Sequence, residues 1–381
     1  MSPSYLNIHS VTGEKIQIDI GYKDLYLGTC TSIHDFEKLN RIGEGTYGVV
    51  YRAKDKRNNT IVALKAVRIF DNDRYSGIPI TALREISILR SLKHKNIISV
   101  LEVAVGKALD DIYMVEEYCE QVYPIDMASI MDAVCVKYTQ SEVKCLTKQL
   151  LEGLEYLHRQ NIIHRDLKMS NLLLNAKGIL KIADFGMARE YREIGMTPHV
   201  VTIWYRSPEL LFGKKNYTSS VDLWSVGCIL GELITSVPLL PGQNEAEQVQ
   251  LIANLLGTPN EAIWPEFRKL PLSKHFNFFS SKTNMIKHKF SSQTIATKDL
   301  LNRLLTYDPE KRISAKIALN HEYFKESPQT QDPSLLPTFP ELRNQQKNDH
   351  KRQNKPIFSK YNNYIFDNSD IEQSFGKRIK K

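Results

Sequence analysis

A glycine-rich stretch near the N-terminus has the spacing that lets backbone groups approach phosphates. Gly43, Gly45 and Gly48 form the pattern GxGxxG. Because glycine has no Cβ, its N–H group can come close to phosphate oxygens. The same pattern occurs at strand-to-helix turns of dinucleotide-binding folds, but here Val49 and Val50 begin a β-branched run that favours a second strand. We therefore expect a hairpin folded over a nucleotide; for this motif alone, an ordinary glycine hairpin stays the alternative.

Further residues along the chain could act on such phosphates. Lys65 lies late in the next β-branched run, where its ammonium group could bind phosphates, and Glu85 on a following helical stretch could pair with it. The segment 164–171 (HRDLKMSN) and Asp184, eighteen residues after Asp166, add oxygen atoms of the kind that Mg²⁺ prefers. Ammonium, carboxylate and amide groups of this kind suit the binding of phosphate groups together with a metal ion.

The elements that must position these residues change character along the chain. Short β-type runs surround one helical stretch: 39–55, 60–69 and 111–118 around 80–93. Apolar residues of that stretch share one face, which we expect to pack on the sheet: Ile80, Leu83, Ile86 and Leu89. Long helical patterns follow at 141–158, 219–234 and 245–257, the last stopping at Gly257. A small β-rich part followed by a larger helical part is an α+β arrangement.

Composition and charge limit the class of protein. The 381 residues are 42% hydrophobic and 25% charged, as in soluble globular proteins, and no apolar run approaches the roughly 20 residues that span a bilayer. The net charge is +8, but residues 343–381 hold ten Lys or Arg against four Asp or Glu, so the basicity lies in a tail. A nucleic-acid-binding body would more often show a basic stripe within the fold. We therefore expect neither direct nucleic-acid binding nor membrane binding.

The start lacks a signal-peptide pattern and the five cysteines are scattered, which favours an intracellular protein.

The order and content of these motifs resemble the signature set of protein kinases. Further matches stand at 204–209 (WYRSPE), Asp222 and Arg312. The resemblance implies a two-lobed kinase fold with a small β-rich N-lobe and a large helical C-lobe. It also implies that the protein uses ATP and Mg²⁺. Asp166 would be the catalytic base and Lys168 would reach the γ-phosphate. The residues expected to hold the metal are Asn171 and Asp184.

The resemblance also implies a set of nucleotide-binding and structural residues. Lys65 and Glu85 would form an ion pair that must be assembled for activity. Glu209 and Arg312 would form a buried ion pair, and Asp222 would accept backbone hydrogen bonds from the catalytic loop. The residues expected to bind ATP are Ile42, Gly43, Glu44, Gly45, Thr46, Tyr47, Gly48, Val49, Val50, Lys65, Glu85, Glu117, Cys119 and Asp126.

Three segments narrow the resemblance to the cyclin-dependent kinase family. Residues 77–85 (GIPITALRE) resemble its PSTAIRE-type helix, most closely the PITSLRE variety, while 196–206 (MTPHVVTIWYR) and 255–271 (LLGTPNEAIWPEFRKLP) are similar to later segments of the family. The resemblance covers roughly residues 28–345. It implies a cyclin partner, protein substrates with Ser or Thr followed by Pro, and a role in cell-cycle or transcription control. A mitogen-activated-type kinase is the rival, but its Thr-x-Tyr motif is absent.

Phosphorylation sites also follow from the resemblance. Thr197 stands at the place of the family's activating phosphothreonine. Three arginines could fork onto its phosphate: Arg84, Arg165 and Arg189. Thr46 and Tyr47, at the tip of the glycine loop, are the expected inhibitory sites, because a phosphate there would repel the triphosphate.

The sequence departs from the family pattern around the hinge. Alignment with the family hinge puts Glu116 behind the adenine, where a bulky apolar residue is usual. A carboxylate there would be desolvated, which raises its pKa unless it finds a partner such as Lys65. Residues 122–125 are an insertion before Asp126, which would otherwise contact the ribose. Ser207 replaces the usual Ala. These departures leave a second hypothesis: a cyclin-binding, weakly active or non-catalytic scaffold.

We therefore expect three parts in the chain. An N-terminal extension occupies 1–35. The kinase domain spans 36–324, with an N-lobe at 36–117, a hinge at 118–126 and a C-lobe at 127–324. A strap and a basic tail expected to be disordered follow at 325–381. The basic end at 377–381 could be a nuclear import signal or a solvated charge run, so we expect a nuclear and cytoplasmic protein.

Overall fold

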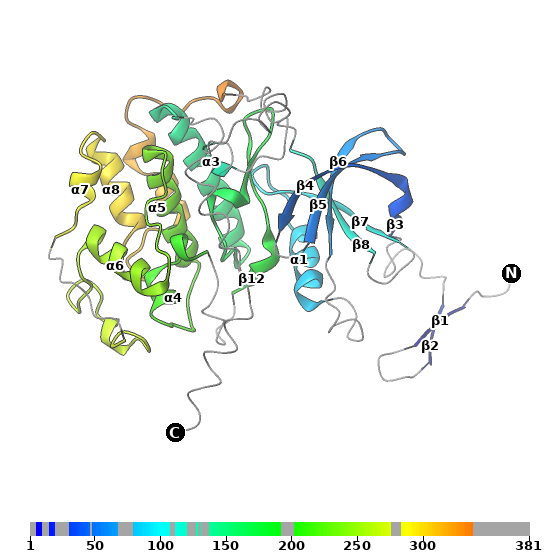
Figure 1. The fold of residues 1–381 in the computed structure, drawn as a ribbon, viewed down its shortest axis with the longest axis horizontal. Coiled ribbons are helices and arrows are strands. Elements are labelled where there is room, and N and C mark those ends of the chain that lie inside the picture. Colours follow the sequence, from blue (N-terminus) through cyan, green and yellow to red (C-terminus); the bar gives the residue numbers. More distant parts are fainter. Residues whose placement is uncertain are drawn as a thin grey trace, which may run out of the picture. The chain divides into compact units, whose positions relative to one another are not determined.

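The computed structural model describes residues 5–9, 15–19, 30–45, 48–67, 79–106, 111–119, 127–128, 131, 137–191, 202–275 and 283–337. The chain divides into two compact units. Residues 1–90 and 99–118 form the N-terminal unit, and residues 91–98 and 119–381 form the C-terminal unit. The first is rich in strands and the second in helices (Figure 1). The predicted α+β arrangement, with a β-rich and a helical part, is confirmed.

A six-stranded sheet forms the frame of the N-terminal unit. Its strands follow the order β3, β7, β8, β6, β5, β4, and neighbours are antiparallel except for β3 with β7. The bounds are Thr31–Ser32 for β3, Phe36–Gly45 for β4, Gly48–Asp55 for β5, Ile61–Ala66 for β6, Val100–Val105 for β7 and Ile112–Glu117 for β8. The three predicted β-type runs are thus strands. A separate antiparallel hairpin consists of β1 (Tyr5–His9) and β2 (Lys15–Asp19).

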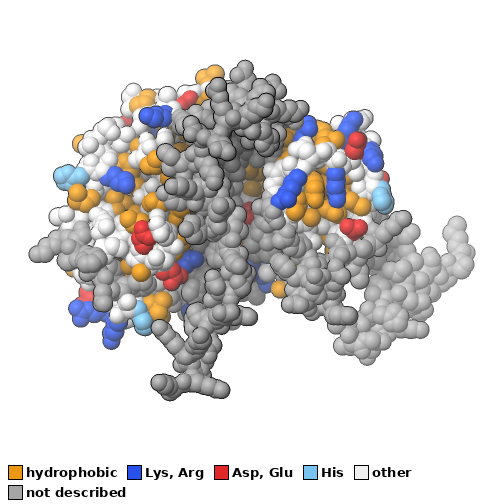
Figure 2. All heavy atoms as spheres, viewed as in Figure 1, with side chains coloured by type: hydrophobic (Ala, Val, Ile, Leu, Met, Phe, Trp, Pro, Cys, Tyr) orange, Lys and Arg blue, Asp and Glu red, His pale blue; other side chains and the backbone are white. Residues whose placement is uncertain are grey.

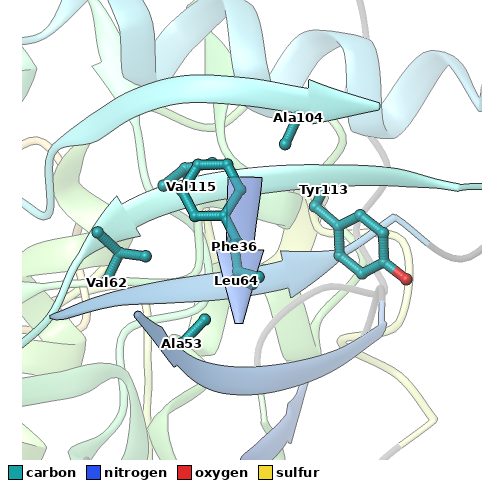
Figure 3. Packing of buried hydrophobic residues seen from close by; sticks show 7 residues of the cluster. All are labelled: Phe36, Ala53, Val62, Leu64, Ala104, Tyr113 and Val115. Carbon is teal, nitrogen blue, oxygen red and sulfur yellow. The ribbon is translucent and has the colours of Figure 1, made fainter. Parts of the chain in front are cut away.

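One face of this sheet carries a hydrophobic core. Because side chains alternate along a strand, Val62 and Leu64 of β6 point to one face while Ala63 and Lys65 point to the other. Side chains from neighbouring strands join the first two in one cluster: Phe36, Ala53, Val62, Leu64, Ala104, Tyr113 and Val115 (Figure 3). The core therefore leaves the opposite face, with Lys65, for other contacts.

Helix α1 (Ile80–Ser91) buries a different face from the predicted one. Its buried residues are Ala82, Glu85, Ile88 and Leu89. Ile80 and Leu83, expected on the packed face, are 69% and 46% exposed, so the prediction was wrong for these two residues. The physical reason is the ion pair between Glu85 and Lys65, which directs the Glu85 side of the helix inward.

The sheet begins before residue 36. Thr31 and Ser32, expected in the N-terminal extension, pair in parallel with Ala104 and Val105 of β7. A 3₁₀ turn, η2 (Ile33–Asp35), then leads directly into β4. The last residues of the expected extension are therefore part of this unit's fold.

Two long helices form the centre of the C-terminal unit. α3 (Gln140–Arg159) begins with a capping box made by Thr139 and Glu142, and α5 (Ser220–Thr235) is buried over most of its length. α3 packs against α5 and α9, and α5 packs against α8. Shorter helices are α4 (Pro208–Leu211), α6 (Glu245–Leu256), α7 (Ile286–Lys289), α8 (Ile295–Leu304) and α9 (Ala315–Leu319). The three predicted long helices are confirmed, and α6 ends at Gly257, whose φ is 86°.

Short strands and 3₁₀ turns hold the loops of this unit that carry the predicted chemistry. β9 (Ile162–Ile163) pairs with β12 (Arg189–Glu190), and β10 (Leu172–Leu174) pairs with β11 (Leu180–Ile182). The 3₁₀ turns are η4 (Met169–Asn171), η5 (Phe185–Met187), η6 (Ile203–Tyr205), η7 (Phe267–Lys269), η8 (Glu322–Phe324) and η9 (Pro333–Leu335). Loop 164–171 is therefore anchored by a strand at each end. In the described part of the chain, no helix has the length and apolar composition needed to cross a membrane.

Candidate active site

The glycine-rich stretch forms the turn end of the β4–β5 hairpin, as predicted. Gly45 pairs with Gly48 across the turn, while Thr46 and Tyr47, the expected inhibitory sites, lie outside the described residues. Gly48 has a φ of 153°, and a Cβ at this position would lie 1.9 Å from the carbonyl oxygen of Ala66. Only glycine therefore fits at Gly48 without moving the neighbouring strand.

Lys65 and Glu85 form a buried ion pair within the N-terminal unit, as predicted. The Lys65 Nζ atom lies 2.8 Å from Glu85 Oε1, and the two residues are 4% and 1% exposed. Because burying an unpaired charge is costly, each of the two residues holds the other in place. The second carboxylate oxygen of Glu85 has no hydrogen-bond partner among the described residues. The pair is assembled in a single chain.

The strand register shows which side chains share the Lys65 face. Lys65 lies opposite Val50 of β5 and Met114 of β8, and Ala63 lies opposite Glu116 of β8. Directly paired residues point to the same face of a sheet. Glu116, which is half-buried, is therefore on the same face as Lys65 and away from the hydrophobic core. A nucleotide bound to the Lys65 ammonium would lie on this face.

The remaining residues predicted to bind ATP are distributed between strands and the hinge. Ile42, Gly43 and Glu44 lie on β4, and Val49 and Val50 lie on β5. Glu117 ends β8, where its N–H donates to the Ser99 carbonyl at 2.9 Å and its Oε1 accepts the Ser99 N–H at 2.8 Å. Cys119 is buried. Asp126 and the insertion at 122–125 lie outside the described residues.

The carboxylate of Asp166 is the centre of a hydrogen-bonded cluster in the C-terminal unit. Lys168 Nζ lies 3.0 Å from Oδ2, and Asn171 Nδ2 donates to the same oxygen at 3.1 Å. The backbone N–H of Thr202 donates to Oδ1 at 3.2 Å. Contacts to both oxygens fix the orientation of this carboxylate, which is 6% exposed. A fixed orientation is what a base needs to accept a proton from a hydroxyl group.

Asn171 and Asp184 present oxygen atoms suited to Mg²⁺. The Asn171 side-chain amide donates twice to Asp166, to its carbonyl oxygen at 2.7 Å and to its carboxylate, so the amide oxygen is the atom that can bind a cation. Asp184 has a left-handed backbone, with φ 59° and ψ 74°. Non-glycine residues seldom adopt this conformation, which is common at functional sites. A carboxylate and an amide oxygen, completed by phosphate oxygens and water, are an ordinary ligand set for Mg²⁺, so these residues fit the metal.

Asp222 on α5 fixes the backbone of loop 164–171, as predicted. Its carboxylate accepts the N–H groups of His164 at 3.0 Å and Arg165 at 2.9 Å, and lies 2.9 Å from His158 Nε2. Burial by itself raises the pKa of Asp222, but the hydrogen bond and charge of His158 hold it below its ordinary value. The ionised carboxylate is therefore available at neutral pH to hold Arg165, whose φ is 67°.

Two of the predicted phosphate-binding arginines lie in the C-terminal unit near Tyr217. Arg165 donates a hydrogen bond of 2.6 Å to the Tyr217 hydroxyl, and both residues are buried. Burial raises the pKa of Tyr217, while the charges of Arg165 and Arg189 oppose that rise. Arg165 thus has a neutral hydroxyl as an acceptor. Of the other expected members of this cluster, Arg84 lies on α1 of the N-terminal unit, and Thr197 lies outside the described residues.

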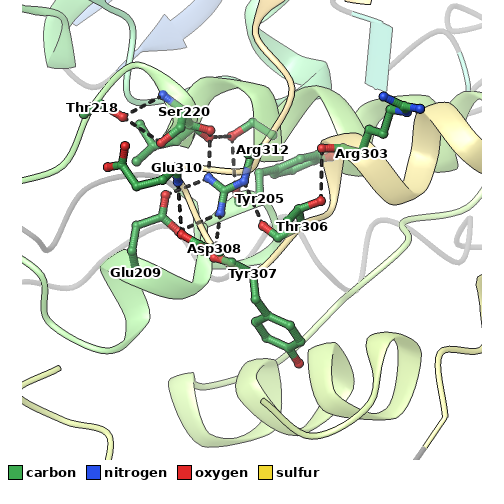
Figure 4. Close-up of polar contacts among 12 residues, drawn as sticks. Tyr205, Glu209, Thr218, Ser220, Arg303, Thr306, Tyr307, Asp308, Glu310 and Arg312 are labelled. Atoms are coloured by element: carbon green, nitrogen blue, oxygen red, sulfur yellow. Dashed lines mark hydrogen bonds and ion pairs between the residues drawn. The ribbon is translucent and has the colours of Figure 1, made fainter. Parts of the chain in front are cut away.

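Glu209 and Arg312 form the predicted buried ion pair (Figure 4). Two hydrogen bonds of 2.6 and 2.8 Å join the guanidinium to the carboxylate, and neither side chain is exposed. Arg312 also donates to the carbonyl oxygens of Ser220 and Thr306. The pair therefore ties α4 to the start of α5 and to the loop before α9.

Ser207, just before α4, has a buried hydroxyl with no hydrogen-bond partner among the described residues.

Sequence reasoning missed two residues that contact the predicted site. Tyr217 is 52 residues from its partner Arg165, and Thr202 is 36 residues from Asp166. Both lie within stretches of ordinary polar composition, so no local pattern marks them. Thr202 does stand inside the segment 196–206, whose similarity to the family could have singled it out.

Comparisons with known proteins all point to protein kinases. A family model described as protein kinase domain matches residues 36–324. Cyclin-dependent kinase 10 from Homo sapiens is 52% identical over 320 residues, which cover 84% of this chain and 87% of that protein. Probable cyclin-dependent kinase 10 from Dictyostelium discoideum is 48% identical over 340 residues, covering 88% of this chain and 90% of that protein. Cyclin-dependent kinase G-2 from Oryza sativa subsp. japonica is 51% identical over 324 residues, covering 82% of this chain and 44% of that protein.

Proposed function

This chain belongs to the cyclin-dependent kinases, a family of protein kinases, and we propose that it transfers the γ-phosphate of ATP to Ser or Thr residues followed by Pro. It is a serine/threonine protein kinase that uses ATP. The observation that carries the assignment of its site is the Asp166 cluster, because one buried carboxylate there is oriented by contacts to both of its oxygens.

Each charged residue of the site has a proposed role in phosphoryl transfer. Asp166 accepts the proton of the substrate hydroxyl and orients that hydroxyl for attack. Lys168, 3.0 Å from Asp166, neutralises charge on the transferred phosphoryl group. Lys65, held by Glu85, binds the other phosphates of the nucleotide beneath the glycine hairpin.

We propose that Asn171 and Asp184 hold Mg²⁺. When bound, the metal neutralises the charge that spreads over the phosphate oxygens during transfer. The protein contributes the orientation of both ligands. Asn171 is held by two hydrogen bonds to Asp166, and Asp184 precedes the turn η5 in a left-handed conformation.

Helix α1 is the proposed contact for a cyclin. Ile80 and Leu83 lie one turn apart on this helix and expose apolar side chains, while Glu85 on the same helix bonds Lys65. A partner covering Ile80 and Leu83 would fix the helix that supplies Glu85. Since the ion pair is already present in a single chain, the cyclin would hold the pair rather than create it.

Phosphorylation of Thr197 is the proposed activating step. A phosphate carries a charge of about −1.5 to −2 and would offer Arg165 an anionic acceptor in place of the neutral Tyr217 hydroxyl. Arg84 and Arg189 are the other proposed contributors. Phosphates on Thr46 and Tyr47 would act in the opposite sense, by repelling ATP.

The proposed setting is the nucleus and cytoplasm, in cell-cycle or transcription control, without direct binding to nucleic acid or membranes. The basic end at 377–381 supports nuclear import, because clustered lysines and arginines are typical of import signals. Import of a fluorescent reporter carrying these residues tests this point. A reporter that stays cytoplasmic would leave them as a solvated charge run.

The test of the proposed function is purification of the tagged chain from cells, identification of the bound cyclin, and a kinase assay of the complex. We expect transfer to a Ser-Pro peptide, much weaker transfer to a Ser-Ala peptide, and little transfer by the chain alone. The Asp166→Asn complex is the control for contaminating kinases. A complex that binds a cyclin but has no activity above this control would favour the scaffold hypothesis instead.

A further inference from the structure

A hollow lies on the N-terminal unit, at the edge of the sheet face opposite Lys65. Its volume is about 400 Å³, and it is lined by η2, the start of β4, the β5–β6 turn and the start of β8, through Ile33, His34, Phe36, Lys38, Lys56, Asp111 and Tyr113. Phe36 and Tyr113 belong to the hydrophobic core (Figure 3), which faces away from Lys65. The hollow is therefore separate from the proposed active site. Ligand-binding cavities usually measure about 300–1,000 Å³, so it can take a small group.

The walls of this hollow are held by hydrogen bonds. The backbone N–H of Lys56 donates to the Asp35 carbonyl at 2.8 Å, and Lys56 Nζ donates to the His34 carbonyl at 2.9 Å. These bonds join the β5–β6 turn to η2. Because β3 pairs with β7 immediately before η2, the segment is also fixed at its other end. The hollow thus exists without a ligand.

Two lysines give the hollow a positive charge. Lys38 Nζ donates to the Tyr113 hydroxyl at 2.8 Å and lies 4.2 and 4.9 Å from the ring centroids of Tyr113 and Tyr51. The partner of Lys56 is a carbonyl oxygen. Neither ammonium group forms an ion pair with a carboxylate in the described part of the chain, and Asp111 is the acidic residue of the lining. The lysines therefore keep donors for an anion.

The nearby Arg57, unlike the two lysines, is paired with carboxylates. It pairs with Asp55 at 2.8 Å and also with Glu102, and these bonds raise its pKa and lower those of both carboxyls. This cation is therefore neutralised within the sheet. Lys56 directly precedes Arg57, and Lys38 lies on the neighbouring strand β4. The hydrogen-bond partners of these two lysines are a carbonyl oxygen and a tyrosine hydroxyl, which are neutral. On the side of the unit visible in Figure 2, basic side chains border exposed hydrophobic ones.

We infer that this hollow binds an acidic side chain of a protein segment, with an apolar neighbour of that side chain resting on Ile33. The two ammonium groups fit a carboxylate or phosphate group, and the volume exceeds that of a single small anion. Half-buried Ile33 lines the hollow beside the lysines and offers an apolar contact that a peptide can use and a free ion cannot. The site goes beyond the proposed transfer reaction and gives the kinase a second contact for a protein partner or substrate, independent of Asp166.

The test uses the full chain with isoleucine methyl groups labelled for NMR, the Ile33 signal being assigned with an Ile33→Val variant. The probes are N-acetylated, C-amidated tripeptides: Leu-Glu-Leu, its neutral match Leu-Gln-Leu, and Leu-phosphoserine-Leu, with inorganic phosphate as the free anion. We expect the Leu-Glu-Leu peptide to shift the Ile33 methyl signal saturably and the Leu-Gln-Leu peptide to bind at least several-fold more weakly.

Substitutions then separate the charges that carry binding. Exposed ion pairs are worth about 0.2–1 kcal/mol, so Lys38→Gln and Lys56→Gln should each weaken binding by a factor of about 1.4 to 5, and Asp111→Asn should strengthen it. Lys177→Gln, which removes an exposed lysine of the C-terminal unit, is the matched control. If Lys38→Gln unfolds the unit, Lys38→Arg keeps the charge and Lys56→Gln still tests the site.

Three results would overturn the inference: equal binding of the neutral peptide, unchanged binding by both lysine variants, or an equal response to inorganic phosphate. The last would make the hollow a site for free anions. Much tighter binding of the phosphoserine peptide would support the inference and identify the occupant as a phosphorylated segment. Because the readout does not use phosphoryl transfer, its failure would leave the proposed function untouched.

Discussion

Replacing Glu209 by Gln is expected to destabilise the C-terminal unit strongly. Both carboxylate oxygens accept hydrogen bonds from Arg312, at 2.6 and 2.8 Å, with both side chains fully buried. Gln keeps the shape but puts an N–H₂ group against the guanidinium and leaves its charge unpaired. Removing one partner of a buried ion pair costs about 3–5 kcal/mol. At about 2–4 °C per kcal/mol, the expected fall in the unfolding midpoint is about 6–20 °C.

Thermal unfolding followed by tryptophan fluorescence measures this effect. All three tryptophans, Trp204, Trp224 and Trp264, belong to the C-terminal unit, so the signal reports on the unit that contains the pair. Glu322→Gln is the matched control, because the Glu322–Lys325 pair is 3.7 Å apart and exposed. It should change stability by less than about 1 kcal/mol. If Glu209→Gln lowered the midpoint no further than this control, the buried pair would not contribute as argued.

Other substitutions test the site and its departures from the family. Asp166→Asn should abolish transfer while ATP binding stays near the wild-type value, and near-normal turnover would exclude Asp166 as the base. Asp184→Asn should shift the Mg²⁺ concentration needed for activity, whereas an unchanged titration would remove its metal role. Ser207→Ala should stabilise the chain by about 1–2 kcal/mol in urea unfolding, because it deletes a buried unpartnered hydroxyl, and a loss of stability would contradict this. Glu116→Phe should tighten ATP binding measured by calorimetry, and unchanged affinity would mean that Glu116 is no obstacle to the nucleotide.

Helices α3 and α6, two of the three long helices predicted in the C-terminal unit, could be predicted because their signals are local. α3 has a capping box at Thr139 and a long apolar period, and α6 ends where Gly257 adopts a positive φ of 86°. Such caps act within one turn of the residues that carry them. The sequence therefore predicted both helices to within a few residues.

The buried face of α1 could not be predicted from its own residues. Periodicity alone favours burial of Ile80 and Leu83, which are exposed, over burial of the charged Glu85. The face is decided by Lys65, which lies on a strand 20 residues earlier and pairs with Glu85. An ion pair across elements thus outweighed the local apolar pattern.

The candidate site likewise contains residues that local motifs predicted and residues that only tertiary contacts identify. Local motifs predicted Asp166, Asn171 and Asp184 because their spacing along the chain is short. Tyr217 and Thr202 contact the site from distant loops, where neither composition nor spacing distinguishes them. Residues that act through tertiary contacts become visible only when the fold brings their loops together.

The parallel pairing of Thr31 and Ser32 with β7 has a consequence for where this protein can be shortened. A chain cut to the matched kinase region, 36–324, would lose β3 and leave the end of β7 at Ala104 and Val105 without its neighbouring strand. Glu102 on that strand would also lose the Thr31 hydroxyl. Open strand edges pair readily with strands of other molecules, so the shortened chain should self-associate and precipitate during expression. Thr31 and Ser32, which precede the matched domain, therefore cover part of the sheet edge, and a truncated chain that is to stay in solution has to retain them.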